Sequence, residues 1–376
     1  MNHIEIQVVE TEAQRRRFVI FPWQIYRNDP LWVPPLVKDR LKFIDPATGV
    51  FFRRGMADFF MAVRDGKVVG TICCAEDREV NSSSGMKDCL IGFFECIQDE
   101  EVALTLFNHA RHWALAHDLD TLYGPFNLDY EDGYGVLIEG RDRPPVLLCG
   151  HTPPYYQGFF ERYGFLPARG DNIAYKFVPA ESQTELDHLA RVADRLRRRN
   201  WIKIRSADLE DWEAEVDRIY FLLNKALAHL PDFHIWPREG LQASLEQFRK
   251  IIDPELVLFA EVDGQAVGWF PGIPNMNEIL IHANGLLYPW DTLRVLPYLK
   301  KQPRCLAIKS VLVLPEYWTR GVAVLLFDEM ARRAIAKGYT WMDLSLTSED
   351  NPYTPALADR AGARLYKRYR VYRLKL

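Results

Sequence analysis

The stretch VLVLPEYWTRGVA, residues 311–323, decides the fold of this 376-residue chain. Its first four residues are all valine or leucine, which is typical of a buried strand, and Pro315 follows them. Beyond the turn, apolar residues recur at helical spacing as far as Lys337, and Gly338 predicts the end of that helix. The first N–H groups of such a helix point at the turn, so they predict a pyrophosphate site beside Arg320 and Gly321.

The same order of segments occurs twice in the chain. FMAVRDGKVVG (60–70) parallels FAEVDGQAVG (259–268), and the Asp-Gly in each predicts a β-hairpin. VALTLF (102–107) parallels VAVLLF (322–327), and each opens a helix. Strands alternate with helices in both halves, so we expect an α/β protein with mixed sheets covered by helices, in two tandem domains.

The expected domains are residues 1–180 and 206–376, joined by a basic helical linker at 181–205. We expect that linker to be solvated, with contact to phosphates as the alternative. The segment 363–374 is expected to be the strand that completes the second domain.

The two copies differ just before the second shared segment. Asp99, Glu100 and Glu101 stand in the first copy where the second has Thr319, Arg320 and Gly321. Carboxylates at a helix N-terminus stabilise the helix but repel a phosphate. The sequence therefore predicts an anion site in the second half only.

Bulk composition narrows the classes of function. Hydrophobic residues make up 48% of the chain and charged residues 26%, with a net charge of -4, which predicts a globular protein without general attraction to nucleic acid. The chain contains no apolar run long enough to span a membrane and no signal-like start. Its six cysteines lack metal-ligand spacing. We expect a cytoplasmic protein with no metal.

The segment 311–323 resembles the acyl-CoA-binding motif of the GCN5-related N-acetyltransferase (GNAT) superfamily, Gln/Arg-x-x-Gly-x-Gly/Ala after a Val-x-Pro strand. Val313, Pro315, Gly321 and Ala323 match, whereas Trp318 stands where Gln or Arg is usual. Asn351 matches an asparagine that often opens the next helix, although it could equally be a helix cap. The resemblance implies these cofactor-binding residues: Val311, Val313, Trp318, Thr319, Arg320, Gly321, Val322, Ala323 and Asn351.

The resemblance covers both halves and implies two tandem GNAT-like domains, the first with a degenerate CoA site. It implies transfer of an acyl group from acetyl-CoA, or from a longer acyl-CoA, to a small-molecule amine. The backbone of 311–313 would align the pantetheine arm. The segments 29–36, 124–127 and 154–156 are also similar to a bacterial group that includes ceramide-synthase-like acyltransferases.

The usual catalytic residues of the family are missing here. Ala358 stands where the family tyrosine is common, and Ala307 and Lys309 occupy the region of the usual carboxylate. Tyr366 is the candidate acid and Asp350 the candidate base, with packing or turn roles as alternatives. Further candidates are Tyr353, Glu349, His282 and His234.

Polar residues of the first half could bind the acceptor. Asn127, Tyr155 and Tyr156 are expected to line a pocket between the domains, unless they only make loop hydrogen bonds. Two rival functions remain at this point: a catalytically silent tandem module that binds a ligand or partner, and an aminoacyl transferase. An unpaired strand edge could also support a homodimer.

Overall fold

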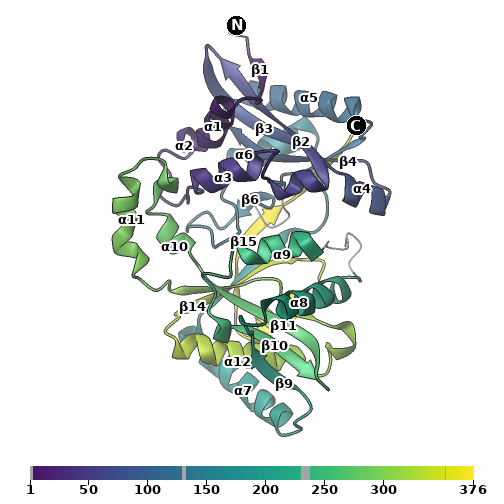
Figure 1. Ribbon diagram of the computed structural model, residues 1–376, viewed down its shortest axis with the longest axis vertical. Helices are drawn as coiled ribbons and strands as arrows, with labels where there is room; N and C mark the ends of the chain where they lie inside the picture. The colour runs from purple at the N-terminus through teal and green to yellow at the C-terminus, as the bar shows by residue number, and fades with distance from the viewer. Residues whose placement is uncertain (1–2, 129–132, 230–237, 352) are drawn as a thin grey trace. The chain divides into compact units, whose positions relative to one another are not determined.

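The computed structural model describes residues 3–128, 133–229, 238–351 and 353–376. They form two compact units, each made of separate stretches of chain (Figure 1). The first unit comprises Met1–Asn172, Asn277–Lys301 and Lys367–Leu376, and the second comprises Ile173–Met276 and Gln302–Tyr366. The units therefore follow a different division of the chain from the boundaries 1–180, 181–205 and 206–376, which remain a prediction.

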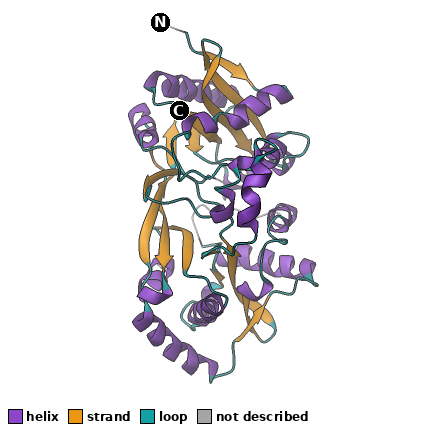
Figure 2. Ribbon diagram, turned by 90° about the vertical axis from the view of Figure 1, so that its left-hand side faces the viewer, coloured by secondary structure: helices purple, strands orange, loops and turns teal. Residues whose placement is uncertain are grey.

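The first unit is built on a seven-stranded sheet of order β1-β2-β3-β4-β5-β16-β7. The strands, in chain order, are β1 (Glu5–Val8), β2 (Gly55–Arg64), β3 (Lys67–Asp77), β4 (Asp88–Cys96), β5 (Thr121–Gly124), β7 (Leu166–Pro167) and β16 (Tyr372–Lys375), with β6 (Val136–Glu139) outside this sheet. The helices are α1 (Glu12–Ile20), α2 (Pro22–Ile25), α3 (Val37–Ile44), α4 (Arg78–Ser84), α5 (Glu100–Ala116), α6 (Tyr155–Tyr163), α10 (Asn277–Leu280) and α11 (Asp291–Leu299). Figure 2 shows the helices packed around the strands.

Both faces of the first sheet are covered. Neighbouring residues of β2 point to opposite faces, and Phe59 and Phe60 are both buried. Phe60 belongs to the core formed with α5 and α6, whereas Phe59 makes an edge-to-face contact with Phe18 of α1. Because both faces are covered, most residues of β4 are buried. Glu95 and Phe93 are two residues apart on this strand, so they lie on the same face of the sheet.

The second sheet is mixed and has the strand order β6-β15-β8-β14-β12-β11-β10-β9, and β13 pairs with β11. Besides β6, its strands are β8 (Asn172–Phe177), β9 (Lys203–Ser206), β10 (Val257–Val262), β11 (Gln265–Pro274), β12 (Cys305–Ile308), β13 (Leu312–Val313), β14 (Trp341–Ser348) and β15 (Arg364–Arg370). The helices of the second unit are α7 (Gln183–Arg197), α8 (Trp212–Ala226), α9 (Arg238–Glu246), α12 (Val322–Ala336) and α13 (Tyr353–Arg360). Figure 1 shows α7 and α12 on one side of this sheet and α8 with α9 on the other. The expected α/β class with mixed sheets is confirmed.

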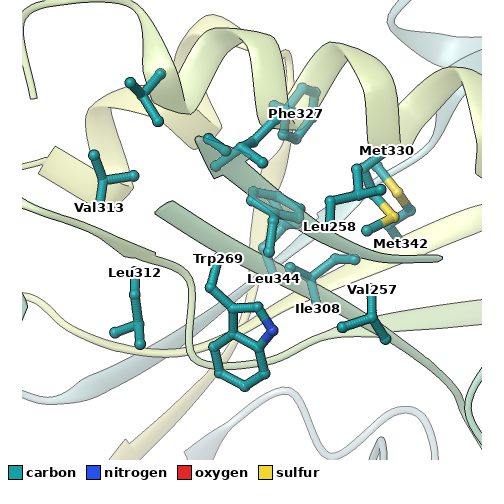
Figure 3. Close-up of a cluster of buried hydrophobic side chains, with 14 of the residues drawn as sticks. Val257, Leu258, Trp269, Ile308, Leu312, Val313, Phe327, Met330, Met342 and Leu344 are labelled. Carbon is teal, nitrogen blue, oxygen red and sulfur yellow. The ribbon is translucent and has the colours of Figure 1, made fainter. Parts of the chain in front are cut away.

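The core of the second unit lies between α12 and the sheet. Phe327 and Met330 of α12 pack over strand residues that include Leu258 and Met342 (Figure 3). Each such large side chain contributes roughly 1.5–3 kcal/mol when it leaves water. This core holds the first turn of α12 in a fixed position against the end of β13.

The internal repeat predicted from sequence recurs in the packing. A Cβ on Gly70 would lie 2.8 Å from Leu106, and one on Gly268 would lie 3.0 Å from Leu326. Both glycines therefore let the following helix approach the sheet closely. The two copies share this contact although the rest of their sequences diverge.

The last strand of the chain differs from expectation. Residues 363–374 were predicted to form one strand of the second domain, but the structure divides them into β15 and β16. β16 lies between β5 and β7 in the first sheet, and β8, the last strand of the first half, lies between β14 and β15 in the second. Each sheet thus includes the final strand of the other half of the sequence.

The basic segment 181–205 is part of the second unit. α7 packs along α12, and Arg197 forms ion pairs with Asp328 and Glu329 of that helix. β9 extends the sheet by pairing with β10. The segment therefore contributes a helix and a strand to the second unit, and its role as a linker between the two predicted domains stays a prediction. Among the described residues, no helix is both long and apolar enough to cross a membrane.

Candidate active site

An extra residue interrupts the central strand of the second unit. Ile308 pairs with Gly272 and Val313 with Gly268, so five steps along this strand oppose four along β11. Ser310 takes up the extra residue with a φ of 51°. The expected single strand 305–314 is therefore two short strands, β12 and β13, separated by a β-bulge.

The bulge controls where backbone N–H groups point. Lys309 N–H donates to Pro271 O and Leu314 N–H to Val267 O at 3.0 Å, so both face β11. Alternate residues of a strand direct their backbone groups to opposite edges. The N–H group of Val313 therefore points away from β11, which suits a strand that aligns an extended ligand.

Trp318 ties the turn to the strand. Its indole N–H donates to Val313 O at 2.8 Å, and its ring lies edge-on to His229 with centroids 4.8 Å apart. This side chain therefore has a structural role in the turn.

The N-terminus of α12 is open. Gly321 is its N-cap with a φ of 85°, no side chain of the described residues caps the helix, and no acidic residue occupies its first turn. Thr319 and Arg320 beside it are exposed. A Cβ on Gly321 would lie 2.5 Å from Leu196 of α7, so both the backbone conformation and this contact require glycine. Val322 is buried and Ala323 half-buried. A helix N-terminus of this kind is a general anion-binding arrangement, and its use for a diphosphate stays a prediction here.

The equivalent end of α5 is closed. The Asp99 side chain accepts from Glu101 N–H and pairs with Arg64 at 2.7 Å. Glu100 pairs with Arg162 at 2.8 Å. The helix end that the sequence predicted to repel anions is thus already occupied by its own carboxylates.

Tyr366 belongs to a buried polar cluster in the second unit. Its hydroxyl donates to Asp343 Oδ1 at 2.6 Å, and Asp343 is 0% exposed. Lys309 Nζ lies 3.3 Å from Asp343 Oδ2 and 2.5 Å from Ser345 Oγ, and Ser345 also donates to Asp343. The carboxylate is compensated by an ammonium group, and the cluster can hold a proton at the tyrosine hydroxyl.

Several other candidates from the second half have contacts of their own. Asp350 is exposed in a turn, where its N–H donates to Ser348 Oγ, and its role as the base stays a prediction. Asn351 donates from Nδ2 to Thr354 Oγ1 at 3.2 Å. His282 stacks on Tyr298 in the first unit. Glu349 is exposed, whereas His234 and the side chain of Tyr353 lie outside the described residues.

Sequence reasoning missed Asp343 and misjudged Lys309. Lys309 entered only as the residue that replaces a family carboxylate, whereas it is the partner of Asp343. The signal was present: an aspartate stands among apolar residues in WMDLSL, residues 341–346. A charged residue inside a buried strand requires a partner.

The three acceptor candidates of the first half gather around β4. Asn127 accepts from Phe93 N–H at 2.8 Å, Tyr155 donates to Cys96 O at 2.9 Å, and Tyr156 donates to Glu95 Oε2 at 2.7 Å. Asn127 and Tyr156 line a cavity of about 270 Å³. The described residues that line it all belong to the first unit, and two of them, Asn277 and Leu280, come from the second half of the sequence. A pocket between the predicted domains stays a prediction. Tyr155 is not among the lining residues, and Glu95, which the sequence did not single out, is.

Comparison with known proteins decides the family. The model of the "Acetyltransferase (GNAT) family" matches residues 210–363. The chain is 30% identical over 370 residues to the "Bacterial ceramide synthase" of Caulobacter vibrioides (strain NA1000 / CB15N), covering 97% of this chain and 95% of that protein. The chain belongs to the GNAT family. "Protein YghO" of Escherichia coli (strain K12) is 26% identical and covers 95% of this GNAT chain and 92% of its own.

Solved structures agree on the tandem fold. A tandem GNAT protein from the clavulanic acid biosynthesis pathway aligns over 99% of this chain and 98% of its own, with a TM-score of 0.60 and 13% identity. A GNAT protein from Sphaerobacter thermophilus aligns with a TM-score of 0.54 and 14% identity, over 99% and 95%. This GNAT protein is therefore an N-acyltransferase, an enzyme that transfers an acyl group from acyl-CoA to an amine. Among the described residues, no group of His, Cys, Asp or Glu side chains could hold a metal ion.

Proposed function

We propose that the second unit binds acyl-CoA, with its diphosphate at the N-terminus of α12 and its pantetheine arm along Val311 and Val313. The observation that carries this proposal is the uncapped helix end at Gly321, beside the exposed Arg320. Its counterpart on α5 is closed by Asp99, so the two halves are not equivalent as anion sites.

We further propose that Tyr366 supplies the proton for the leaving thiolate. The amine nitrogen attacks the thioester carbonyl carbon, a C–N bond forms, and the C–S bond breaks. The thiolate takes the hydroxyl proton of Tyr366, and the proton released by the amine restores the hydroxyl. Asp343 orients this hydroxyl, and Lys309 keeps the carboxylate compensated throughout. Alignment of amine and thioester supplies much of the acceleration.

The donor in this proposal is a long-chain acyl-CoA, with acetyl-CoA as the alternative. Support comes from the relative named as a ceramide synthase, which shares 30% identity along nearly the whole chain. Ceramides are long-chain N-acyl products. We also assign the enzyme to the cytoplasm, because its six cysteines are all free and five of them are buried.

Isothermal titration with palmitoyl-CoA and acetyl-CoA, followed by a thiol-release assay with an amine panel, tests the proposal. The double variant Thr319→Asp/Arg320→Glu places the carboxylates of the α5 turn on α12 without filling space. Its affinity for acyl-CoA should fall by roughly 100-fold, as charge-assisted hydrogen bonds to the diphosphate are lost. The matched control is Glu101→Gln on α5, which should bind as the wild type does. Equal binding by the double variant would exclude this site.

A further inference from the structure

The cavity of the first unit has apolar walls and a small set of polar groups. Its walls include Phe18, Trp32, Pro34, Phe93 and Leu280. At about 270 Å³ it lies near the lower end of usual ligand pockets, roughly 300 Å³. A pocket of this size and lining holds a polar head and the first part of an apolar chain.

Glu95 is an acceptor in this cavity without a cationic partner in the described part of the chain. Its hydrogen bonds come from the hydroxyl of Tyr156, at 2.7 Å, and from that of Tyr26, at 3.4 Å. The Tyr26 hydroxyl also lies 3.0 Å from His151 O, to which it can donate instead. The Tyr156 hydroxyl also accepts from Cys96 N–H at 2.8 Å, so its own proton is directed to Glu95. A carboxylate enclosed in this way is stabilised by an ammonium group that enters the cavity.

His151 supplies a second acceptor. Its side chain is 4% exposed, and Nε2 lies 2.7 Å from Asp29 Oδ2. That hydrogen bond assigns the ring proton to Nε2 and leaves Nδ1 with its lone pair. Nδ1 is buried and has no hydrogen-bond partner among the residues that the structure describes, while the ring lines the cavity. Buried polar atoms normally have partners, so this one calls for a donor from a ligand.

We propose that this cavity binds the amine acceptor, a primary amine on an apolar chain, with Glu95 and His151 Nδ1 accepting hydrogen bonds from the amine head. The apolar walls take the beginning of the chain. The acceptor role rests on the proposed function, but the binding of an alkylamine does not. The pairing of an amine with Glu95 also explains why the degenerate half of the chain retains polar groups around β4.

One cationic side chain also lines the cavity. The Arg40 guanidinium lies 5.4 Å from the ring centroids of both Phe43 and Phe93. An anionic ligand such as a fatty acid could approach it, but would face Glu95. The amine is favoured because Glu95 and His151, two residues that carry hydrogen-bond acceptors, both line the same cavity.

The affinity for an amine should depend on pH. Burial raises the pKa of Glu95 to about 7, so its charged form, which pairs with an ammonium, grows as the pH rises through that value. Burial lowers the pKa of His151, which keeps Nδ1 available as an acceptor. The titratable and charged groups that interact with Glu95 or line its cavity include Tyr26, Tyr155, Tyr156, Cys96, His151 with Asp29, Arg40 and Cys149.

Calorimetric titration of the full chain with decylamine, decanol and decanoate at about pH 8 tests the proposal. Decylamine should bind roughly tenfold or more tightly than the other two, and Glu95→Gln should remove that preference. The matched control is the exposed Glu79, as Glu79→Gln, which should bind as the wild type does. Thermal unfolding checks that each variant is folded.

Tighter binding of decanoate than of decylamine, or an unchanged preference in Glu95→Gln, would overturn the assignment of the pocket. Palmitoyl-CoA affinity is read separately and should be the same in wild type and Glu95→Gln. If palmitoyl-CoA does not bind to the wild type, the proposed function is wrong. A preference for decylamine that depends on Glu95 would still support the assignment of the cavity.

Discussion

The two halves of the chain treat equivalent helix ends in opposite ways. On α5, Asp99 caps the first turn, and its carboxylate and that of Glu100 have arginine partners. On α12, Gly321 leaves the first turn uncapped beside Arg320. The fold tolerates either solution, because the packing of both helices rests on the same contact with Gly70 or Gly268. A repeated fold can thus lose an anion site without losing the helix that formed it.

The buried carboxylates differ in the same sense. Asp343 in the second unit has the ammonium group of Lys309 as a partner. Glu95 in the first has hydroxyl partners only, within the part of the chain that the structure describes. The negative charge of Asp343 is thus compensated by Lys309, whereas that of Glu95 would be compensated by a bound cationic ligand.

The largest effect is expected for the compensated carboxylate, Asp343. Lys309→Met leaves Asp343 buried without its cation and should lower the free energy of unfolding by about 3–5 kcal/mol. Adding Asp343→Asn removes the charge while keeping an acceptor for Tyr366, so the double variant should recover most of the loss. Urea unfolding measures both. A single variant no less stable than the double one would show that the pair does not matter to stability.

Next in size is the loss of the tyrosine hydroxyl. Tyr366→Phe should lower kcat by roughly 10- to 100-fold and leave the KM for acyl-CoA nearly unchanged, since it removes the proton donor and no binding group. Steady-state thiol release gives both constants. Tyr163→Phe, which removes an exposed hydroxyl bonded to Asn108, is the control. An unchanged kcat would remove Tyr366 from the chemistry.

A smaller effect tests whether Glu95 lacks a cation. Its pKa is raised by burial from 4.5 to about 7, so the folded state binds more protons than the unfolded state between these values. Its contribution to stability is therefore full below about pH 4.5 and lost as the pH rises through 7. Glutamine does not ionise, so Glu95→Gln should gain roughly 1–3 kcal/mol relative to the wild type between about pH 5 and pH 8. Thermal unfolding at both pH values, with Glu79→Gln as control, measures the gain; a constant difference would contradict it.

The smallest effect is expected at the closed helix end. Glu101 is exposed and its pair with Arg64 is long, at 3.3 Å. Glu101→Gln should change stability by less than about 0.5 kcal/mol and acyl-CoA affinity by less than about twofold. A large gain in affinity from this variant would mean that the first unit is a latent CoA site.

The sequence predicted where helices and strands occur better than it predicted which strands pair in each sheet. The hairpin at Asp65-Gly66 and the helices over 100–117 and 322–337 follow from turn chemistry and periodicity, and the structure has them. The exchange of β8 and β16 was not predicted, because alternation specifies which face of a strand is buried but not which strand lies beside it.

The site was predictable only where it is local in sequence. The open turn at Gly321 lies within one segment and was identified there. Asp343 and Glu95 accept hydrogen bonds from Tyr366 and Tyr156, and these tyrosines lie on elements that are distant in the sequence. No spacing rule connects such pairs before the chain is folded.

In the proposed complex, acyl-CoA is held by the helix end that lacks a carboxylate cap. A crystal structure of the protein with coenzyme A would locate the nucleotide. The diphosphate should lie within hydrogen-bond distance of the backbone N–H groups that follow Gly321. Density for the nucleotide at Asp99 instead, or in the cavity around Glu95, would contradict this placement.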